Sequence, residues 1–331
     1  MTPRNDQPSN RSSSSWVILL SFFLAAVLLF FALQGIDWVA FGKTLLNGHY
    51  ELVLITIPIA SVNYFIRSVR WSLLVRSEKN VPILSVFWAN MVGYMGNTFL
   101  PARAGELVRS AFLGQKTELG TSFVLATALI ERVLDVAALV LIGSICLLGQ
   151  PNVPAALLDA VRVMALASVV GLMVILIVPF QEQFFLSALN KIPLPAAVAQ
   201  RISDILKRFL VGMRSMRSIR RMGLFVGLTL AIWLIDGIGN VIGAQIISQS
   251  LNLGQALVLL AGLGLSSAIP STPGYVGIYQ FVAVTVLVPF GFSRSDALAY
   301  ILISQVLTLL TVGFWGLIGL WQIKRNKKVN E

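Results

Sequence analysis

The sequence has a single cysteine, Cys146, and a single histidine, His49, among 331 residues. Cys146 lies in an apolar stretch and has no second cysteine to pair with, so we expect no intrachain disulfide and no thiolate-bound metal. A lone histidine likewise builds neither a histidine-rich metal site nor a proton relay. We therefore expect a protein without a metal ion or another cofactor.

Charged residues are also scarce, at 12% of the chain, whereas hydrophobic residues make up 56%. The mean hydropathy of +0.83 lies outside the range of soluble globular proteins. Basic residues outnumber acidic ones by 25 to 14, but no segment is long and polar enough to form a water-facing, nucleic-acid-binding domain. The composition predicts an all-α membrane protein whose partners are lipids and not nucleic acids, and it says nothing of protein partners.

Apolar stretches account for most of the chain, and each is long enough to cross a bilayer at about 20 residues per crossing. They run over about 16–33, 52–75, 122–148, 161–180, 222–247 and 298–322. No convincing cleavage site follows the first stretch, so we expect a retained span and not a secretory signal. We expect a single transmembrane domain over 16–322, a disordered tail at 1–15 and a basic tail at 323–331.

Two further apolar regions, about 83–114 and 255–291, are interrupted at their centres by the same pattern, Pro-x-x-x-Gly. The interruptions are residues 101–105, here called the first break, and residues 270–274, the second break. Proline and glycine end helices, so each region is predicted to form a helical hairpin. Whether the hairpins are re-entrant or cross the membrane twice stays open.

The loops between the apolar stretches alternate in charge, which predicts their orientation. Lysine and arginine gather at 1–15, 76–79, 181–221 and 324–328, whereas the intervening loops carry only Lys43 and Arg294. Both termini are therefore predicted to be cytoplasmic. Residues 16–148 and 161–322 then repeat the order span, span, hairpin, span with opposite orientation, an inverted repeat typical of secondary transporters.

The segment at about 196–221 has apolar residues at helical spacing and basic residues on its other side. This pattern predicts an amphipathic helix in the cytoplasmic interface, attracted to anionic headgroups. The alternative is a loop whose charges only set the topology.

Polar residues surround both breaks, although backbone and side chains at membrane depth need hydrogen-bond partners. The ends of the half-helices offer unpaired N–H groups, to which a phosphate headgroup is a natural ligand. We therefore predict that the breaks form a headgroup site. Its candidate residues are Asn97, Pro101, Arg103, Gly105, Glu106 and Arg109 at the first break, and Pro270, Ser271, Thr272, Pro273, Gly274, Tyr279 and Gln280 at the second.

Further polar residues lie within the spans, where a charge costs about 2.5–3.5 kcal/mol at the helix centre. Glu131 and Asp135 are four residues apart and share a helix face, as are Asp236 and Asn240. We expect pairs between arginines and carboxylates across helices; the alternatives are purely structural ion pairs and arginines that reach the interface. The residues are Asn63, Arg67, Arg70, Glu131, Arg132, Asp135, Asp236 and Asn240.

Four blocks of this sequence resemble the lysylphosphatidylglycerol synthase transmembrane-region family, also called flippase-like. They are residues 63–71 (NYFIRSVRW), 97–109 (NTFLPARAGELVR), 131–135 (ERVLD) and 269–280 (IPSTPGYVGIYQ). The resemblance implies a role in moving lipid, because in bifunctional members this region is associated with moving aminoacylated phospholipid between leaflets, while a cytosolic domain synthesises that lipid. No such domain follows the last span here, so we expect no synthase activity. Many members have a glutamate after the P-G-x-x-G turn, whereas here Tyr279 and Gln280 follow Gly277 and Ile278, which puts a carboxylate role at that position in doubt.

The prediction for function is translocation of a polar-headed lipid across the cytoplasmic membrane. Arg103 and Arg109 would attract the phosphate, and Glu106 would pair with them or with a cationic headgroup. Glu131 and Asp135 would orient the arginines. The alternatives are a membrane component of a lipid-linked sugar or hopanoid pathway, and an ion-coupled small-solute transporter. We expect no enzyme, because the sequence offers no nucleophile–base pair, metal-ligand cluster or nucleotide loop.

Overall fold

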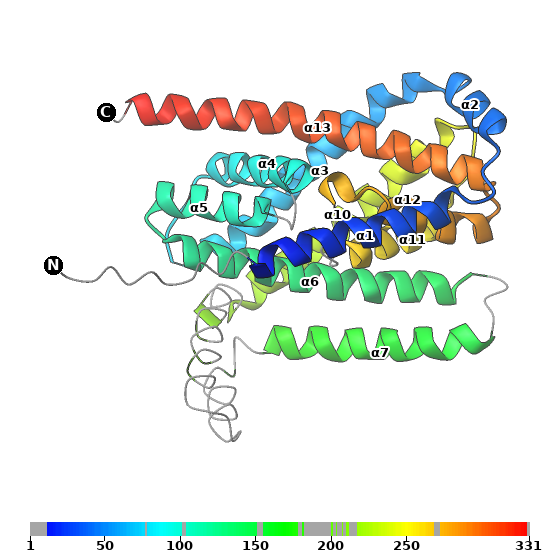
Figure 1. The fold of residues 1–331 in the computed structure, drawn as a ribbon. Coiled ribbons are helices and arrows are strands. Elements are labelled where there is room, and N and C mark those ends of the chain that lie inside the picture. The colour runs from blue at the N-terminus through cyan, green and yellow to red at the C-terminus, as the bar shows by residue number, and fades with distance from the viewer. Residues whose placement is uncertain are drawn as a thin grey trace.

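The computed structural model describes residues 12–76, 78–100, 104–150, 155–177, 181, 200, 203, 207, 210, 211, 217–267 and 272–329. Within these ranges the regular elements are all helices, and the all-α prediction is confirmed. Helices from the two ends of the chain lie side by side in one bundle, with α7 at its periphery (Figure 1).

The described elements up to residue 177 are seven α-helices and a short 3-10 helix. They are α1 (Ser12–Leu33), α2 (Trp38–Leu46), η1 (Tyr50–Leu52), α3 (Val53–Val75), α4 (Ile83–Phe99), α5 (Gly105–Thr117), α6 (Thr121–Leu148) and α7 (Ala155–Ile177). The remaining described elements are α10 (Ile219–Gln245), α11 (Leu253–Ser266), η5 (Pro273–Tyr275), α12 (Ile278–Leu287), η6 (Val288–Phe290) and α13 (Arg294–Val329).

Several of these helices are long and apolar enough to cross a membrane, which makes the chain an integral membrane protein. Four qualify by length and composition, over Tyr50–Val75, Ile219–Gln245, Pro273–Phe290 and Arg294–Arg325. Helices α1 and α2, which meet at 90°, count as a fifth only if the pair is one broken span. The predicted span at 122–148 is a helix of 28 residues, α6, whose charges at Glu131, Arg132 and Asp135 reduce its apolar character. Its length of about 42 Å still exceeds the hydrocarbon thickness.

The segment at 35–51 was predicted to be a loop, and this was wrong, because α2 occupies most of it. Asp37 begins the helix by accepting hydrogen bonds from the backbone N–H groups of Val39 and Ala40, at 2.9 and 3.0 Å. The side chains of Trp38, Val39 and Leu46 are exposed. A short helix with an exposed apolar face resembles an interfacial segment, and its nine residues are too few to register as a span.

Helix boundaries also differ from the predicted tails. Helix α1 begins at Ser12, within the predicted tail at 1–15, and α13 continues to Val329, through most of the predicted basic tail. Lysine and arginine are good helix formers and are favourable near a helix C-terminus, so α13 has no reason to end at the edge of the hydrocarbon. The predicted interfacial helix at 196–221 lies largely outside the described residues.

Both predicted hairpins are present. Helix α4 packs against α5, and α11 packs against α12. The helix contacts of one half have counterparts in the other half. Between the halves, α4 packs on α13 and α11 packs on α6; within them, α3 packs on α4 and α10 packs on α11. A two-fold relation between the halves requires such counterparts, and the inverted repeat itself stays a prediction.

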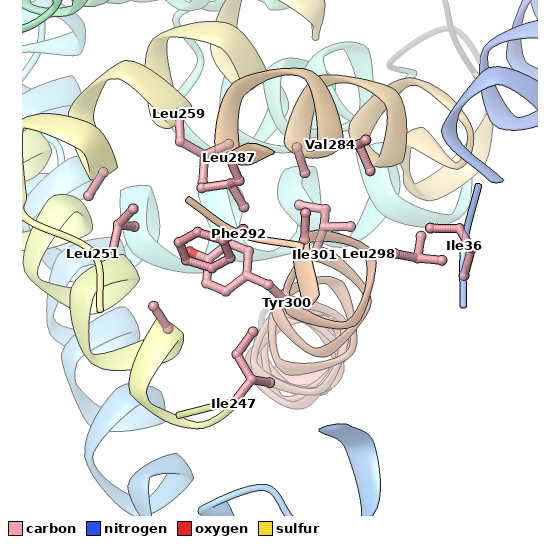
Figure 2. Close-up of a cluster of buried hydrophobic side chains, with 14 residues drawn as sticks. Ile36, Ile247, Leu251, Leu259, Val284, Leu287, Phe292, Leu298, Tyr300 and Ile301 are labelled. Carbon is pink, nitrogen blue, oxygen red and sulfur yellow. The ribbon is translucent and has the colours of Figure 1, made fainter. Parts of the chain in front are cut away.

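Each half has its own apolar core. The first core joins α3, α4, α5 and α6 around Trp71 and Leu113. The second lies where α10, α11, α12 and α13 meet; Figure 2 shows Phe292 and Tyr300 within it, with Leu287 and Ile301 nearby. The rings of Phe292 and Tyr300 pack edge to face, with their centroids 6.3 Å apart. These two cores fix the positions of the helices that carry the buried charged residues.

Candidate functional site at the helix breaks

Close backbone contact between α4 and α5 forms the first hairpin. A methyl group on Gly105 would lie 2.0 Å from the Gly93 carbonyl oxygen and 2.5 Å from the Asn97 nitrogen. A methyl group on Gly96 would lie 2.8 Å from the Gly105 Cα atom. The predicted site residue Gly105 is therefore required for packing, because any side chain there would push the two arms apart.

Behind the hairpin, Arg70 of α3 holds two carboxylates of α6. Its Nη1 and Nη2 atoms donate to Asp135 at 2.5 and 2.8 Å, and Nη2 also donates to Glu131 at 2.9 Å. The Arg70 side chain is fully buried, and its guanidinium lies over the Phe225 ring at 5.2 Å. The predicted pairing of a span arginine with Glu131 and Asp135 is confirmed.

Arg109 of α5 links the hairpin to this pair. Its guanidinium donates to Glu106 and to the Asn90 oxygen at 2.6 Å each, and to Glu131 at 3.2 Å. It also lies over the Trp71 ring at 4.5 Å. Arg109 is 3% exposed, so protein groups take up its donors in this state; its role in phosphate binding stays a prediction.

The cluster becomes accessible at Arg132 and Glu106. Arg132 donates to Glu106 at 2.9 Å, and the Asn97 amide lies 3.4 Å from the same carboxylate oxygen. The Arg132 side chain is 35% exposed and that of Glu106 is 14% exposed. Among the described residues Arg132 makes this one hydrogen bond, so most of its guanidinium donors remain free for a ligand.

A second, smaller cluster connects α3 with α10. Arg67 and Asn63 both donate to the Asp236 carboxylate, and the Arg67 guanidinium lies over the Trp233 ring at 4.7 Å. The predicted pairing of Arg67 with a carboxylate is thus confirmed as well. Asn240 does not join the arginines, because its amide donates to the Asp236 backbone at 2.7 Å and its oxygen accepts from Tyr300.

Among the described residues, no ion pair lies at the second break. Gly274 and Gly277 have positive φ angles of 67° and 89°, which glycine adopts readily. Thr272 donates to the Val276 carbonyl at 2.8 Å, and the rings of Tyr275 and Tyr279 stack at 4.7 Å. Of the predicted candidates here, Thr272 is thus held by a hydrogen bond to the backbone and Tyr279 by ring stacking.

The described residues beside the two breaks lie close together, as the prediction of neighbouring breaks requires. Helix α4 contacts η5, and a methyl group on Gly274 would lie 3.9 Å from the Thr98 carbonyl oxygen. Four candidates, Pro101, Arg103, Pro270 and Ser271, lie outside the described residues, so their contacts and roles stay predictions. That both breaks lie within the thickness of the membrane also stays a prediction.

The site also contains polar residues that sequence reasoning missed. Asn90 accepts from Arg109 and donates to Ser68 at 3.0 Å, and Thr229 accepts from Arg70 at 3.2 Å. Gln305 contacts the second break, at 2.8 Å from the Gly274 carbonyl. Each is a lone polar residue in an apolar stretch, the same signal that identified Asp236. Among the described residues no three acidic, histidine or cysteine side chains are grouped as metal ligands.

Comparison with known proteins agrees with this architecture. The sequence matches the family described as "Lysylphosphatidylglycerol synthase TM region" over residues 18–316. It is also similar to the UPF0104 membrane protein MJ1078 of Methanocaldococcus jannaschii, with 26% identity over 238 residues, which cover 70% of this chain and 94% of that protein. With the helix breaks and the buried charges in place, the match over most of the chain shows that the protein belongs to the lysylphosphatidylglycerol synthase transmembrane-region family.

Proposed function

We propose that this protein moves a lipid with an anionic, phosphate-containing headgroup between the leaflets of its membrane. The observation that carries the proposal is the buried cluster of arginines and carboxylates that becomes accessible at Arg132 and Glu106, beside two adjacent helix breaks. Charges inside a membrane protein are costly and usually mark the path of a polar substrate. The family is one linked to lipid and flippase-like roles, which supports the same substrate class.

The charge balance of the site favours an anion. Arg67, Arg70, Arg109 and Arg132 face four carboxylates, Glu106, Glu131, Asp135 and Asp236, so the described ion pairs cancel. The first break adds one more arginine, Arg103, without a further carboxylate. A single phosphate group would neutralise this excess, whereas a cationic solute would increase it.

The geometry suggests how a headgroup binds. Arg132 is paired with Glu106 through one oxygen, while Arg109 holds the other oxygen of the same carboxylate. A phosphate that approaches Arg132 replaces Glu106, which stays bound to Arg109, so no carboxylate is left unpaired. The N-terminus of α5, which begins at Gly105, adds unpaired N–H groups and a partial positive charge at the first break.

The test is lipid movement in proteoliposomes that contain the purified protein. Headgroup-labelled phosphatidylglycerol and phosphatidylcholine are incorporated, and the fraction accessible to an external quencher is followed in time. We expect protein-dependent movement that is faster for phosphatidylglycerol. Arg132→Gln should slow it by roughly tenfold or more, because a charge-assisted hydrogen bond contributes about 1.5–3 kcal/mol.

Arg220→Gln is the matched control, since Arg220 lies on the exposed first turn of α10, away from the breaks. This variant should move lipid at the wild-type rate. Lipid movement no faster than in protein-free vesicles, for any anionic headgroup, would overturn the proposed function. A wild-type rate in folded Arg132→Gln would overturn the role of that residue.

A further inference from the structure

Two glutamines, from different helices, hold the backbone of the second break. The Gly277 N–H donates to the Gln280 oxygen at 2.7 Å, and the Gln280 amide donates to the Gln305 oxygen at 2.6 Å. The Gln305 amide in turn donates to the Gly274 carbonyl at 2.8 Å. The hydrogen bonds thus run from Gly277, just after the second break, through Gln280 of α12 and Gln305 of α13, to Gly274 within the break.

The break needs this support because its backbone is not helical. Gly274, Tyr275 and Gly277 all have φ angles in the left-handed region, at 67°, 58° and 89°. For tyrosine this conformation costs energy and persists only where the surroundings impose it. A carbonyl group inside a membrane also needs a donor, and Gln305 supplies one to Gly274.

Each glutamine side chain both accepts and donates a hydrogen bond, whereas an ionised glutamate could only accept. Gln280 accepts with its oxygen and donates with its nitrogen, and Gln305 does the same. The first break, by contrast, is held by the charged Arg132–Glu106 pair. The second break is therefore fixed without adding charge to the site.

We propose that Gln305 is a positioning residue for the translocation site: its amide fixes the Gly274 carbonyl and so holds the second break against the first. The inference rests on the proposed function. Its structural basis is the contact of the second break with the end of α4 that leads into the first break, where a methyl group on Gly274 would lie 3.9 Å from the Thr98 carbonyl oxygen. If Gly274 is released, the second break no longer has a fixed place beside the headgroup path.

Two changes of equal size should release Gly274 through different atoms. Gln305→Glu removes the donor to Gly274 and leaves two carbonyl-type oxygens facing each other. Gln280→Glu still accepts from Gly277, but it draws the Gln305 amide toward the new carboxylate and turns the Gln305 oxygen toward Gly274. A role in bulk packing would predict no effect from either change, because neither alters side-chain volume appreciably.

Gln255→Glu is the matched control. Gln255 occupies the same third position of a helix, α11, that Gln280 occupies in α12, and its oxygen accepts from the Asn252 N–H at 3.0 Å. Glutamate keeps this hydrogen bond and is favourable near a helix N-terminus. The control introduces the same charge at the same kind of position, away from the second break.

The distance between the breaks is measured with spin labels on the full-length protein in lipid nanodiscs. Leu100→Cys and Val276→Cys carry the labels in a Cys146→Ala background, since both positions are exposed and flank the breaks. We expect a single narrow distance distribution for the parent and for Gln255→Glu. Gln305→Glu and Gln280→Glu should broaden it, and the folded protein of both variants should move lipid roughly tenfold more slowly.

A distribution as narrow as the parent's in both Gln305→Glu and Gln280→Glu would overturn the proposal. If Gln305→Glu fails to fold, Gln305→Met, which is uncharged and lacks the donor, takes its place under the same criterion. The distance measurement does not depend on transport. A parent protein that moves no lipid, together with a broadened distance distribution in the two variants, would therefore refute the proposed function and keep the positioning of the break.

Discussion

Arg70 and Asp135 face each other as a two-point pair, with Nη1–Oδ1 and Nη2–Oδ2 distances of 2.5 and 2.8 Å, and the Arg70 side chain is fully buried. This relationship ties α3 to α6, and the second contact of Arg70, with Glu131, extends it toward the hairpin. Planar two-point pairing is specific to arginine. The pair is therefore expected to stabilise the helix arrangement more than it contacts substrate.

Removal of Arg70 alone should destabilise the protein strongly. Arg70→Ala leaves Asp135 buried and without its partner, at a cost of about 3–5 kcal/mol. The double variant Arg70→Met/Asp135→Leu should recover part of this loss, because neither charge remains. Thermal unfolding in detergent measures both, with Arg220→Ala as the exposed control. Wild-type stability of Arg70→Ala would contradict the structural role.

Gly105→Ala should disrupt the first hairpin. The added methyl group would lie 2.0 Å from the Gly93 carbonyl oxygen, so α5 must move away from α4. Overpacking of this kind costs about 1–3 kcal/mol or more. Gly171→Ala in α7, where nothing lies within 4 Å, is the control and should be neutral or slightly stabilising. Equal yields of folded protein from the two variants, by size-exclusion chromatography, would refute the close-contact argument.

Arg103→Lys and Glu106→Gln separate a transport role from a structural one. Lysine keeps the charge of Arg103 but loses the planar fork, so a two-point phosphate contact predicts lost lipid movement with near-normal folding. Glu106→Gln removes the carboxylate that pairs with both Arg109 and Arg132, and lipid movement by this variant should fall as well. Lipid movement by both variants is measured in proteoliposomes, and the yield of folded protein is measured alongside it.

The two outcomes that count against this assignment differ in kind. Wild-type lipid movement by both folded variants would exclude Arg103 and Glu106 from the translocation site. Loss of folded protein in both would give them a structural role, because an unpaired buried charge is costly.

Both termini are expected to be cytoplasmic. The basic segments at 1–15 and 324–328 motivate this, together with the loops between them. Reporter fusions whose activity depends on the compartment check each end, and an external C-terminus would end the inverted-repeat interpretation.

Much of the site could be predicted because its residues conflict with their surroundings. Proline and glycine identified both breaks, and charges in apolar stretches identified Arg70, Glu131 and Asp135, since each needs a partner away from lipid. The sequence could not decide which arginine binds which carboxylate. That depends on the rotation and packing of α3 against α6 and α10, and it is Arg70, not Arg67, that contacts both acidic residues of α6.

Other features left too weak a signal for prediction. Gln305 and Asn90 are uncharged, and a single amide in a span is often a packing detail, so neither was a candidate although both bond to the site. Helix α2 was taken as a loop because its nine residues are too few for a span. The contacts that bring Gln305 and Asn90 to the site come from residues 31 and 19 positions away in the sequence.

The central claim is that a phosphate headgroup enters between the two breaks, and photo-crosslinking tests it most directly. Phosphatidylglycerol with a photoreactive headgroup is illuminated with the reconstituted protein, and the labelled peptides are mapped by mass spectrometry. The account predicts labelling of residues 97–109 and 272–280, reduced by Arg132→Gln and unchanged by Arg220→Gln. Labelling confined to lipid-facing helices such as α7, with none at either break, would contradict it.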